Sequence, residues 1–210
     1  DVWLAFKLLF QLWRWKKGDS ISALEQKFVR YSGVRYACSF NSGRSAFFAI
    51  LSSLGLRQGD EVLLQAFTCN AVPNPVLWAG LRPIYVDCRE DDLNIDPADL
   101  ERKITLRLRS GQAPKAVIVQ HTFGFPADID RIQAVCQQHN LILIEDCAHA
   151  LGARYKGRLV GSFGKASFFS FSRDKVISSV YGGMAVTNDP ILAKNIQTFQ
   201  QEVGYPSFLW

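Results

Sequence analysis

The sequence predicts an α/β fold, in which a mostly parallel central sheet is covered by helices on both faces. Short apolar runs of strand type alternate along the chain with longer segments whose apolar residues recur at helical spacing. The runs are mostly apolar and do not alternate strictly with polar residues, which is typical of parallel strands buried on both faces. Glycine and aspartate residues between the segments supply turns. Together these observations favour strands and helices in alternation.

Capping and turn residues set the limits of the predicted elements. Asp19 or Ser20 can cap the first helix, in which Leu24 and Phe28 recur at helical spacing. Gly55 ends a later apolar helix, as glycine often does. The predicted elements are, in order, helix 21–31, strand 36–40, helix 46–54, strand 61–64, helix 74–79, strand 83–87, helix 97–103, strand 115–120, helix 128–139, strand 141–145 and an aromatic run of strand type from residue 167.

Size and composition are those of one globular domain. The chain has 210 residues and is 48% hydrophobic, which is enough for one sizeable core. The formal charge of +5 would allow an anionic partner, but basic residues are scattered among acids, and no nucleic acid is expected. The five cysteines form no C-x-x-C pair and the three histidines are isolated, so we expect a cytoplasmic protein without a metal site.

Residues 1–18 differ from the rest of the chain. They are apolar and aromatic, with basic residues toward the end, and Lys7 interrupts a segment too short to span a membrane. Packing against a partner subunit or another part of the protein is the favoured interpretation, and an amphipathic helix on a membrane surface stays open. We therefore divide the chain into this helical segment and a domain over residues 19–210. Because it starts at Asp1 rather than methionine, we expect a piece of a longer protein.

Ligands of open α/β sheets bind beyond the carboxyl ends of strands, and three such ends carry polar groups. At the first, Ser42, Gly43, Arg44 and Ser45 precede an apolar helix, whose free N–H groups and dipole suit a phosphate. An ordinary strand-to-helix turn, with Arg44 facing solvent, is the alternative.

The other two strand ends bring a carboxylate and an amine. The apolar strand 141–145 leads to Asp146, and a buried carboxylate stays ionised beside a protonated heteroaromatic nitrogen. Lys175 follows the aromatic run and precedes the pair Gly182-Gly183, where a packed scaffold can hold a reactive amine. The alternatives are a structural cap for the acid and a solvated loop for the lysine.

An amine, a carboxylate and a phosphate cradle together match pyridoxal 5′-phosphate. Lys175 would form the Schiff base, Asp146 would keep the ring nitrogen protonated so that the ring withdraws electrons, and the helix start would hold the phosphate. A dinucleotide-binding Rossmann protein is disfavoured, because no G-x-G-x-x-G follows the first strand.

The chain resembles the DegT/DnrJ/EryC1/StrS family of pyridoxal-phosphate-dependent sugar aminotransferases. The resemblance implies the large domain of the aspartate-aminotransferase-like (type I) fold, with the smaller C-terminal domain absent from this chain. The motifs that carry it run in order from about residue 24 to 190: Asn41-Ser42-Gly43, Gly59-Asp60-Glu61-Val62, Ala66-Phe67-Thr68, Leu93-Asn94-Ile95-Asp96-Pro97, His121 with Gly124, Pro126-Ala127-Asp128, Glu145-Asp146-Cys147-Ala148-His149-Ala150, Gly161-Ser162-Phe163-Gly164, Phe169-Ser170-Phe171 with Lys175, and Gly182-Gly183 with Thr187-Asn188-Asp189.

The resemblance also assigns residues to the cofactor. It implies that Lys175 binds the cofactor covalently and shuttles the proton, that Asp146 pairs with the ring nitrogen, and that His149 lies near the ring hydroxyl. Ser170 and the backbone at residues 43–45 would hold the phosphate. The full set is Gly43, Arg44, Ser45, Cys69, Asp146, His149, Ser170 and Lys175.

Three positions differ from the common family pattern. Arg44 stands where threonine is common, Cys69 where many members carry an aromatic that stacks on the cofactor ring, and Val176 where asparagine is frequent. The first change exchanges a hydroxyl contact for a charge. The second replaces a stacking ring with a thiol, which packs but cannot stack.

The resemblance implies transfer of an amino group from an amino acid, expected to be glutamate, to a nucleotide-linked keto-sugar. Lys175 favours transamination over dehydration, because related dehydratases carry histidine at this position. A homodimer is expected. The alternative is a catalytically impaired family member or fragment that serves as a binding or assembly module, which Cys69 and the absent C-terminal part favour.

Overall fold

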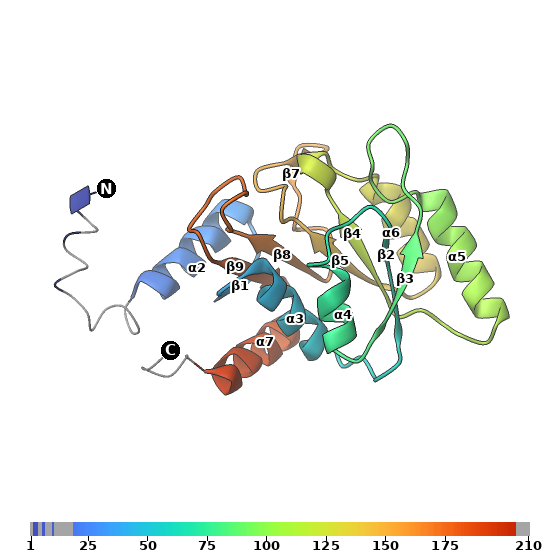
Figure 1. Cartoon of the computed structure of the whole chain (residues 1–210), viewed down its shortest axis with the longest axis horizontal. Helices are drawn as coiled ribbons and strands as arrows, with labels where there is room; N and C mark the ends of the chain where they lie inside the picture. Colours follow the sequence, from blue (N-terminus) through green and yellow to red (C-terminus); the bar gives the residue numbers. More distant parts are fainter. Residues whose placement is uncertain (1, 4–5, 7–9, 11–18, 205–210) are drawn as a thin grey trace.

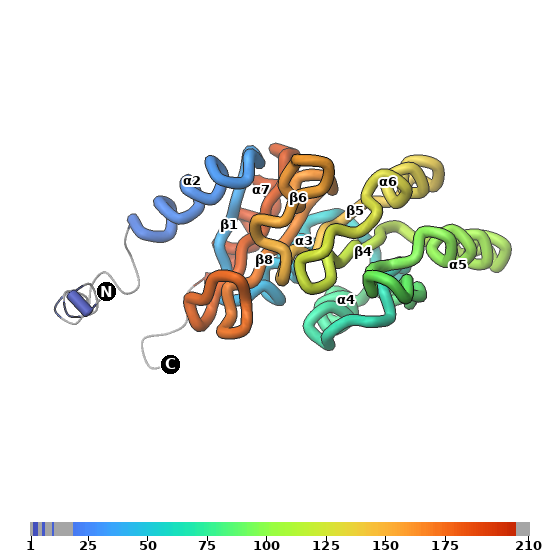
Figure 2. Tube along the Cα trace, turned by 90° about the horizontal axis from the view of Figure 1, so that it is seen from above, coloured from blue at the N-terminus to red at the C-terminus, as the bar shows by residue number. Residues whose placement is uncertain are grey.

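A seven-stranded sheet lies between two layers of helices in the computed structural model (Figures 1 and 2). The structure describes residues 2–3, 6, 10 and 19–204, so the predicted helix over residues 2–17 falls almost entirely outside the described residues. Within the described part, no helix is both long and apolar enough to cross a membrane.

The elements alternate as the sequence predicts. The strands of the sheet are β1 Tyr36–Phe40, β2 Glu61–Gln65, β3 Arg82–Val86, β4 Ala116–Gln120, β5 Ile142–Asp146, β8 Ala166–Ser170 and β9 Gly183–Thr187. The helices are α2 Ser20–Ser32, α3 Gly43–Ser53, α4 Pro73–Trp78, α5 Pro97–Arg109, α6 Ile129–Gln138 and α7 Pro190–Val203, with a 3-10 turn at Thr122–Gly124. A separate hairpin pairs β6 Arg154–Tyr155 with β7 Arg158–Leu159.

The sheet is mostly parallel, which confirms the predicted fold class. Its strand order is β1-β9-β8-β5-β4-β2-β3. The pairs β2·β3, β2·β4, β4·β5 and β5·β8 are parallel, and β9 runs antiparallel to both of its neighbours. Strand β9 was not among the predicted strands, because its short apolar run follows directly on a glycine pair that reads as a turn.

Two adjacent phenylalanines of β8 show how the core is divided between the layers. Phe168 stacks on Phe47 of α3, with ring centroids 4.6 Å apart, while Phe169 meets Phe28 of α2 edge-on at 4.9 Å. Successive strand residues point to opposite faces, so α3, α4 and α7 cover one face and α2, α5 and α6 the other. This explains why both adjacent phenylalanines of β8 are buried.

Two helices extend several residues beyond one of their predicted ends. Helix α3 begins at Gly43 instead of residue 46, because the Ser42 side chain caps it by accepting a hydrogen bond from the Ser45 N–H at 3.1 Å. Helix α5 continues past residue 103 to Arg109, where basic residues in the last turn suit the negative end of the helix dipole. The earlier start of α3 brings its N-terminus to the strand ends.

Candidate active site

A cavity of about 510 Å³ lies at the carboxyl ends of the central strands. Its volume is within the range of small-molecule sites. Seven of the eight residues assigned from the sequence line it: Gly43, Arg44, Cys69, Asp146, His149, Ser170 and Lys175. The eighth, Ser45, lies on α3 just beyond the lining. Residues from the ends of four strands, β1, β2, β5 and β8, are therefore brought to one site.

Lys175 is held inside this cavity rather than in solvent. Its side chain is 13% exposed, and its Nζ lies 2.8 Å from Nε2 of His149. Asp174, which is 71% exposed, places Oδ2 3.2 Å from the same nitrogen. The backbone N–H of Lys175 donates to the carbonyl of Ser172, closing a turn directly after β8. The solvated-loop alternative is thus not what the structure shows.

His149 is the nearest side chain to the lysine nitrogen. Burial lowers its pKa, and the positive charge of Lys175 lowers it further, against a smaller opposite effect of Asp174. The imidazole is therefore neutral at neutral pH. In that form Nε2 accepts the hydrogen bond from Lys175 Nζ, and Nδ1 carries the ring proton.

Asp146 is a buried carboxyl group that faces the cavity. It is 4% exposed, and its Oδ1 accepts the backbone N–H of Ala148 at 2.9 Å. Burial raises its pKa to about 6, although this N–H and the positive charge of Lys175 act in the opposite direction. A cationic N–H donor inside the cavity would stabilise the ionised form of this buried carboxyl.

The N-terminus of α3 and the end of β8 meet at the other part of the cavity. A Cβ added to Gly43 would lie 2.8 Å from Cβ of Ser170, so only glycine allows this approach. The hydroxyls of Ser170 and Ser172 lie 2.8 Å apart. The first-turn N–H groups of a helix attract anions, but the N–H of Ser45 is already bound by Ser42. Ser45 is thereby the least suited of the predicted phosphate contacts.

Arg44 and Cys69 occupy the border of the cavity. The guanidinium of Arg44 lies 6.0 Å from the ring centroid of Trp78, at cation–π distance, on the exposed side of α3. The thiol of Cys69 is exposed and lies 3.4 Å from the backbone N of Ala71. Both side chains reach the site, although neither provides the contact that is common in the family.

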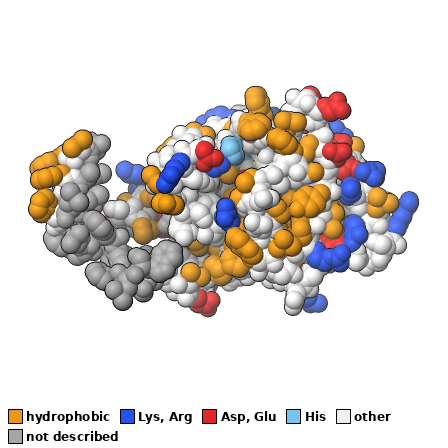
Figure 3. Space-filling view, in the orientation of Figure 1, with side chains coloured by type: hydrophobic (Ala, Val, Ile, Leu, Met, Phe, Trp, Pro, Cys, Tyr) orange, Lys and Arg blue, Asp and Glu red, His pale blue; other side chains and the backbone are white. Residues whose placement is uncertain are grey.

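Some lining residues were not identified from the sequence. Ser42, which caps α3 and lines the cavity, belongs to the predicted phosphate-binding turn, but Ser172 was not identified, although a second hydroxyl shortly after Ser170 is a signal that the sequence contains. The rim carries Phe67, 47% exposed, and Phe123, 63% exposed, with ring centroids 6.1 Å apart. Figure 3 shows hydrophobic side chains spread over the middle of one face of the molecule. The exposure of such rings depends on the fold and has no local sequence signal.

We predict that Gly43→Ala weakens the site through steric overlap. The new methyl group would lie 2.8 Å from Ser170 Cβ and 3.1 Å from the carbonyl oxygen of Phe169, so α3 must move away from β8. Overpacking of this kind costs about 1–3 kcal/mol. Urea unfolding should show a lower unfolding free energy, and a pyridoxal phosphate titration should show a lower cofactor affinity.

Gly111→Ala is the control for this prediction. Gly111 has φ +74 and nothing within 4 Å of the added Cβ, so it tests a glycine replacement far from the cavity. It should lower stability without changing cofactor affinity. Unchanged cofactor affinity in Gly43→Ala would show that α3 does not form the phosphate end.

The fold and the cavity define a class of protein. A mostly parallel sheet, with a lysine, a buried aspartate and a helix N-terminus around one cavity, is the large domain of a type I pyridoxal-phosphate enzyme. The chain belongs to the DegT/DnrJ/EryC1/StrS aminotransferase family, whose model matches residues 6–205.

Individual relatives agree with this assignment. GDP-perosamine synthase of Escherichia coli O157:H7 is 38% identical over 180 residues, which cover 86% of this chain and 48% of that protein. The crystal structure of a DegT DnrJ EryC1 StrS aminotransferase from Brucella abortus superimposes with a TM-score of 0.88 at 28% identity, covering 96% of this chain and 55% of the other. The chain thus spans about half the length of the relatives that it matches.

The comparisons also give the cofactor of the family. The E. coli GDP-4-keto-6-deoxy-D-mannose-3-dehydratase was solved with bound hydrated PLP; it is 25% identical, with a TM-score of 0.84, covering 93% of this chain and 50% of that one. The residues present here fit this group. Asp146 offers a buried acceptor with one hydrogen bond from the described residues, and the Gly43 cradle leaves no room for a methyl group.

Proposed function

We propose that the protein is a pyridoxal-phosphate-dependent aminotransferase that moves an amino group from an amino acid, glutamate, to a nucleotide-linked keto-sugar. The observation that carries this proposal is the position of Lys175, whose Nζ lies inside a cavity shared with Asp146 and His149. The relative named GDP-perosamine synthase supports a nucleotide-linked sugar as the acceptor.

Different lining residues would bind different parts of the cofactor. Asp146 would accept a hydrogen bond from the protonated ring nitrogen, and this ion pair would offset the burial of its carboxylate. Ser170, Ser172 and the backbone at Gly43 would bind the phosphate at the positive end of α3. His149 would lie on the lysine side of the ring.

Lys175 has two tasks in this proposal. When bound, pyridoxal phosphate supplies an aldehyde carbon for a covalent bond and a ring that withdraws electrons. Lys175 Nζ provides the amine for that bond and, when free of it, moves a proton between substrate atoms. The neutral Nε2 of His149 accepts a hydrogen bond from Nζ and so directs the amine into the cavity.

The proposal extends to the organisation of the chain. Residues 19–210 would form the cofactor-binding large domain, and residues 1–18 a separate N-terminal segment. Two copies would associate as a homodimer. Light scattering of the intact protein tests this association, and a monomer would count against it.

An amino-transfer assay tests the proposed activity. The purified protein, supplied with pyridoxal phosphate and glutamate, is offered a panel of nucleotide-linked keto-sugars, and 2-oxoglutarate is measured together with the amino-sugar product. We expect turnover of at least one member of the panel. Cofactor binding without turnover of any acceptor or donor would favour the binding or assembly module instead.

A further inference from the structure

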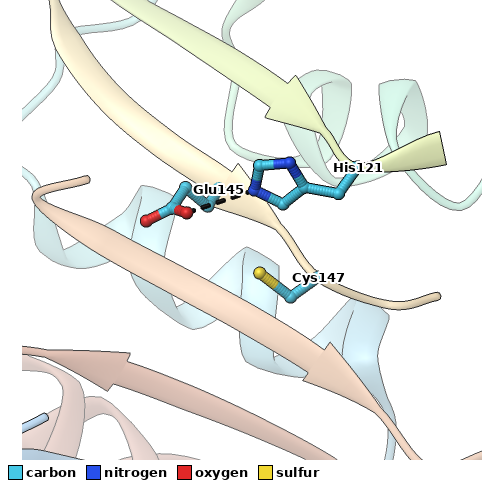
Figure 4. Close-up of side chains that lie close together, drawn as sticks. All are labelled: His121, Glu145 and Cys147. Carbon is cyan, nitrogen blue, oxygen red and sulfur yellow. Dashed lines mark hydrogen bonds and ion pairs between the residues drawn. The ribbon is translucent and has the colours of Figure 1, made fainter. Parts of the chain in front are cut away.

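The strongest feature that the proposed mechanism does not use is a buried cluster behind the cavity. His121, Glu145 and Cys147 lie together, and their exposed fractions are 0%, 0% and 1% (Figure 4). Glu145 and Asp146 are neighbours on β5, so their side chains point to opposite faces of the sheet. Asp146 therefore faces the cavity, and Glu145 faces the cluster.

The Glu145 carboxylate is held by four N–H groups. Its Oε2 accepts the N–H of Gly161 at 2.7 Å and Nε2 of His121 at 3.1 Å. Its Oε1 accepts the backbone N–H groups of Phe163 and Gly164, both at 2.7 Å. Burial raises the pKa of Glu145, but these hydrogen bonds and His121 outweigh it and keep the pKa below its ordinary value. The group is an ionised carboxylate with its acceptor sites filled.

His121 is fixed from both sides. Its Nδ1 accepts the backbone N–H of Ala127 at 3.2 Å, which places the ring proton on Nε2, where it donates to Glu145. The backbone N–H of His121 donates to the carbonyl of Asp146 at 3.1 Å. One histidine thus connects the end of β4 to the backbone of the residue that faces the cavity.

These contacts do not describe a metal site. Both ring nitrogens of His121 and both oxygens of Glu145 already have partners. Burial, with the charges of Glu145 and Asp146, raises the pKa of the Cys147 thiol well above its ordinary value, so it stays protonated. A protonated thiol is a poor metal ligand.

The cluster instead connects the ends of two strands to the segment that precedes a third. Its hydrogen bonds join the end of β4, the end of β5 and the 161–164 segment that leads into β8. On the cavity side, the N–H of Ala148 is the one group among the described residues that donates a hydrogen bond to the Asp146 side chain. The position of its carboxylate therefore depends on the backbone that the cluster holds.

We propose that Glu145 and His121 form a positioning pair for the cofactor site. Their buried hydrogen bonds fix the backbone at Asp146 and so set the place where its carboxylate meets the ring nitrogen. This inference rests on the proposed function for its ligand. It assigns to Glu145 no contact with the cofactor itself.

Four variants test the pair. Glu145→Gln keeps the shape of the side chain, removes its charge and turns an amide toward N–H donors. His121→Leu removes one N–H donor, while three backbone N–H groups still hold Glu145. His121→Gln is the conservative variant, because its amide can still donate to Glu145. Glu61→Gln is the matched control: Glu61 is 4% exposed and paired with Arg107, and it lies at the opposite end of the sheet, where β2 starts.

Two measurements are made on each purified variant. The first is the dissociation constant of pyridoxal phosphate, and the second is the titration of the Asp146 carboxyl carbon by NMR in the cofactor-free protein. We expect Glu145→Gln and His121→Leu to weaken cofactor binding by about 10–100-fold, the range known for residues that orient the ligands of bound metals. In both, Asp146 should titrate closer to a solvated aspartate, because a displaced carboxyl gains water.

The control and the rescue separate positioning from general stability. Glu61→Gln should lower the unfolding free energy without changing either measurement, and His121→Gln should restore most of the affinity lost in His121→Leu. If Glu145→Gln does not fold, the measurements on His121→Leu alone test the positioning role. Native cofactor affinity with an unchanged Asp146 titration in His121→Leu would overturn the inference, as would an equal loss in Glu61→Gln. Should the unmodified protein bind no cofactor, the proposed function fails, and the Asp146 titration alone decides on the pair.

Discussion

Lys175→Ala should lower the rate of amino transfer by about 10⁴-fold, the upper end of what one acid–base group contributes. The variant lacks both the amine that binds the cofactor and the group that moves the proton. Among the residues that the structure describes, no second lysine lines the cavity to take over either task. Steady-state kinetics with glutamate and the best acceptor measure the effect.

Two variants accompany this measurement. Lys175→Arg keeps the positive charge beside Asp174 and His149 but is a poor nucleophile, so it should be as inactive as the alanine variant. Lys156→Ala removes a lysine that is 70% exposed and paired with Asp130, and should leave the rate unchanged. A Lys175→Ala enzyme that retains a tenth of the activity would refute the role of this residue.

Asp146→Asn should have opposite effects on activity and on stability. The amide cannot hold a protonated ring nitrogen by charge, so the rate should fall by about 10²–10⁴-fold. Stability without cofactor should rise at neutral pH, because the variant no longer buries an ionised carboxylate. Function and stability therefore oppose each other at this residue.

The pH dependence of this effect has a definite sign. The pKa of Asp146 is about 6 in the folded protein, above the ordinary value of 3.8. Between these values the folded state binds more protons than the unfolded state, so its stability falls as pH rises, by about 3 kcal/mol in total. In Asp146→Asn, stability should not show this part of the decrease with rising pH.

Urea unfolding of the cofactor-free proteins from pH 3.5 to 7 measures the difference. The wild type and Asp146→Asn should be similarly stable at the acid end and diverge as the pH rises. Asp130→Asn, a change at an exposed surface carboxyl, serves as the control and should follow the wild type. Parallel stability curves for wild type and Asp146→Asn would show that burial does not raise the pKa of Asp146.

Much of the site could be predicted from the sequence, because parallel strands bring residues distant in the chain to one edge. Asp146 and Lys175 each follow a recognisable apolar strand, and the alternation of elements predicts that these strands share a sheet. Gly43 was identified because glycine and serine precede an apolar helix. The structure adds the reason that glycine is required there, which is the close approach of Ser170.

Other features depend on contacts that no local pattern contains. Ser45 was assigned to the phosphate with its neighbours, but the cap formed by Ser42 uses its N–H group. The contact between His149 and Lys175 joins residues 26 positions apart. The Glu145 carboxylate accepts hydrogen bonds from N–H groups of residues 161–164, which are distant from it in the sequence. The sequence therefore shows an acidic pair at the end of β5, but not that the two side chains lie on opposite faces of the sheet and have different roles.

The most direct test of the proposal is chemical trapping of the cofactor. The purified protein is mixed with pyridoxal phosphate, reduced with borohydride and digested, and the peptides are mapped by mass. Because the reduction makes the bond between amine nitrogen and cofactor carbon permanent, the cofactor mass should appear on the peptide that contains Lys175. A protein that carries no cofactor after reduction, or carries it on other lysines only, would contradict the assignment of this site.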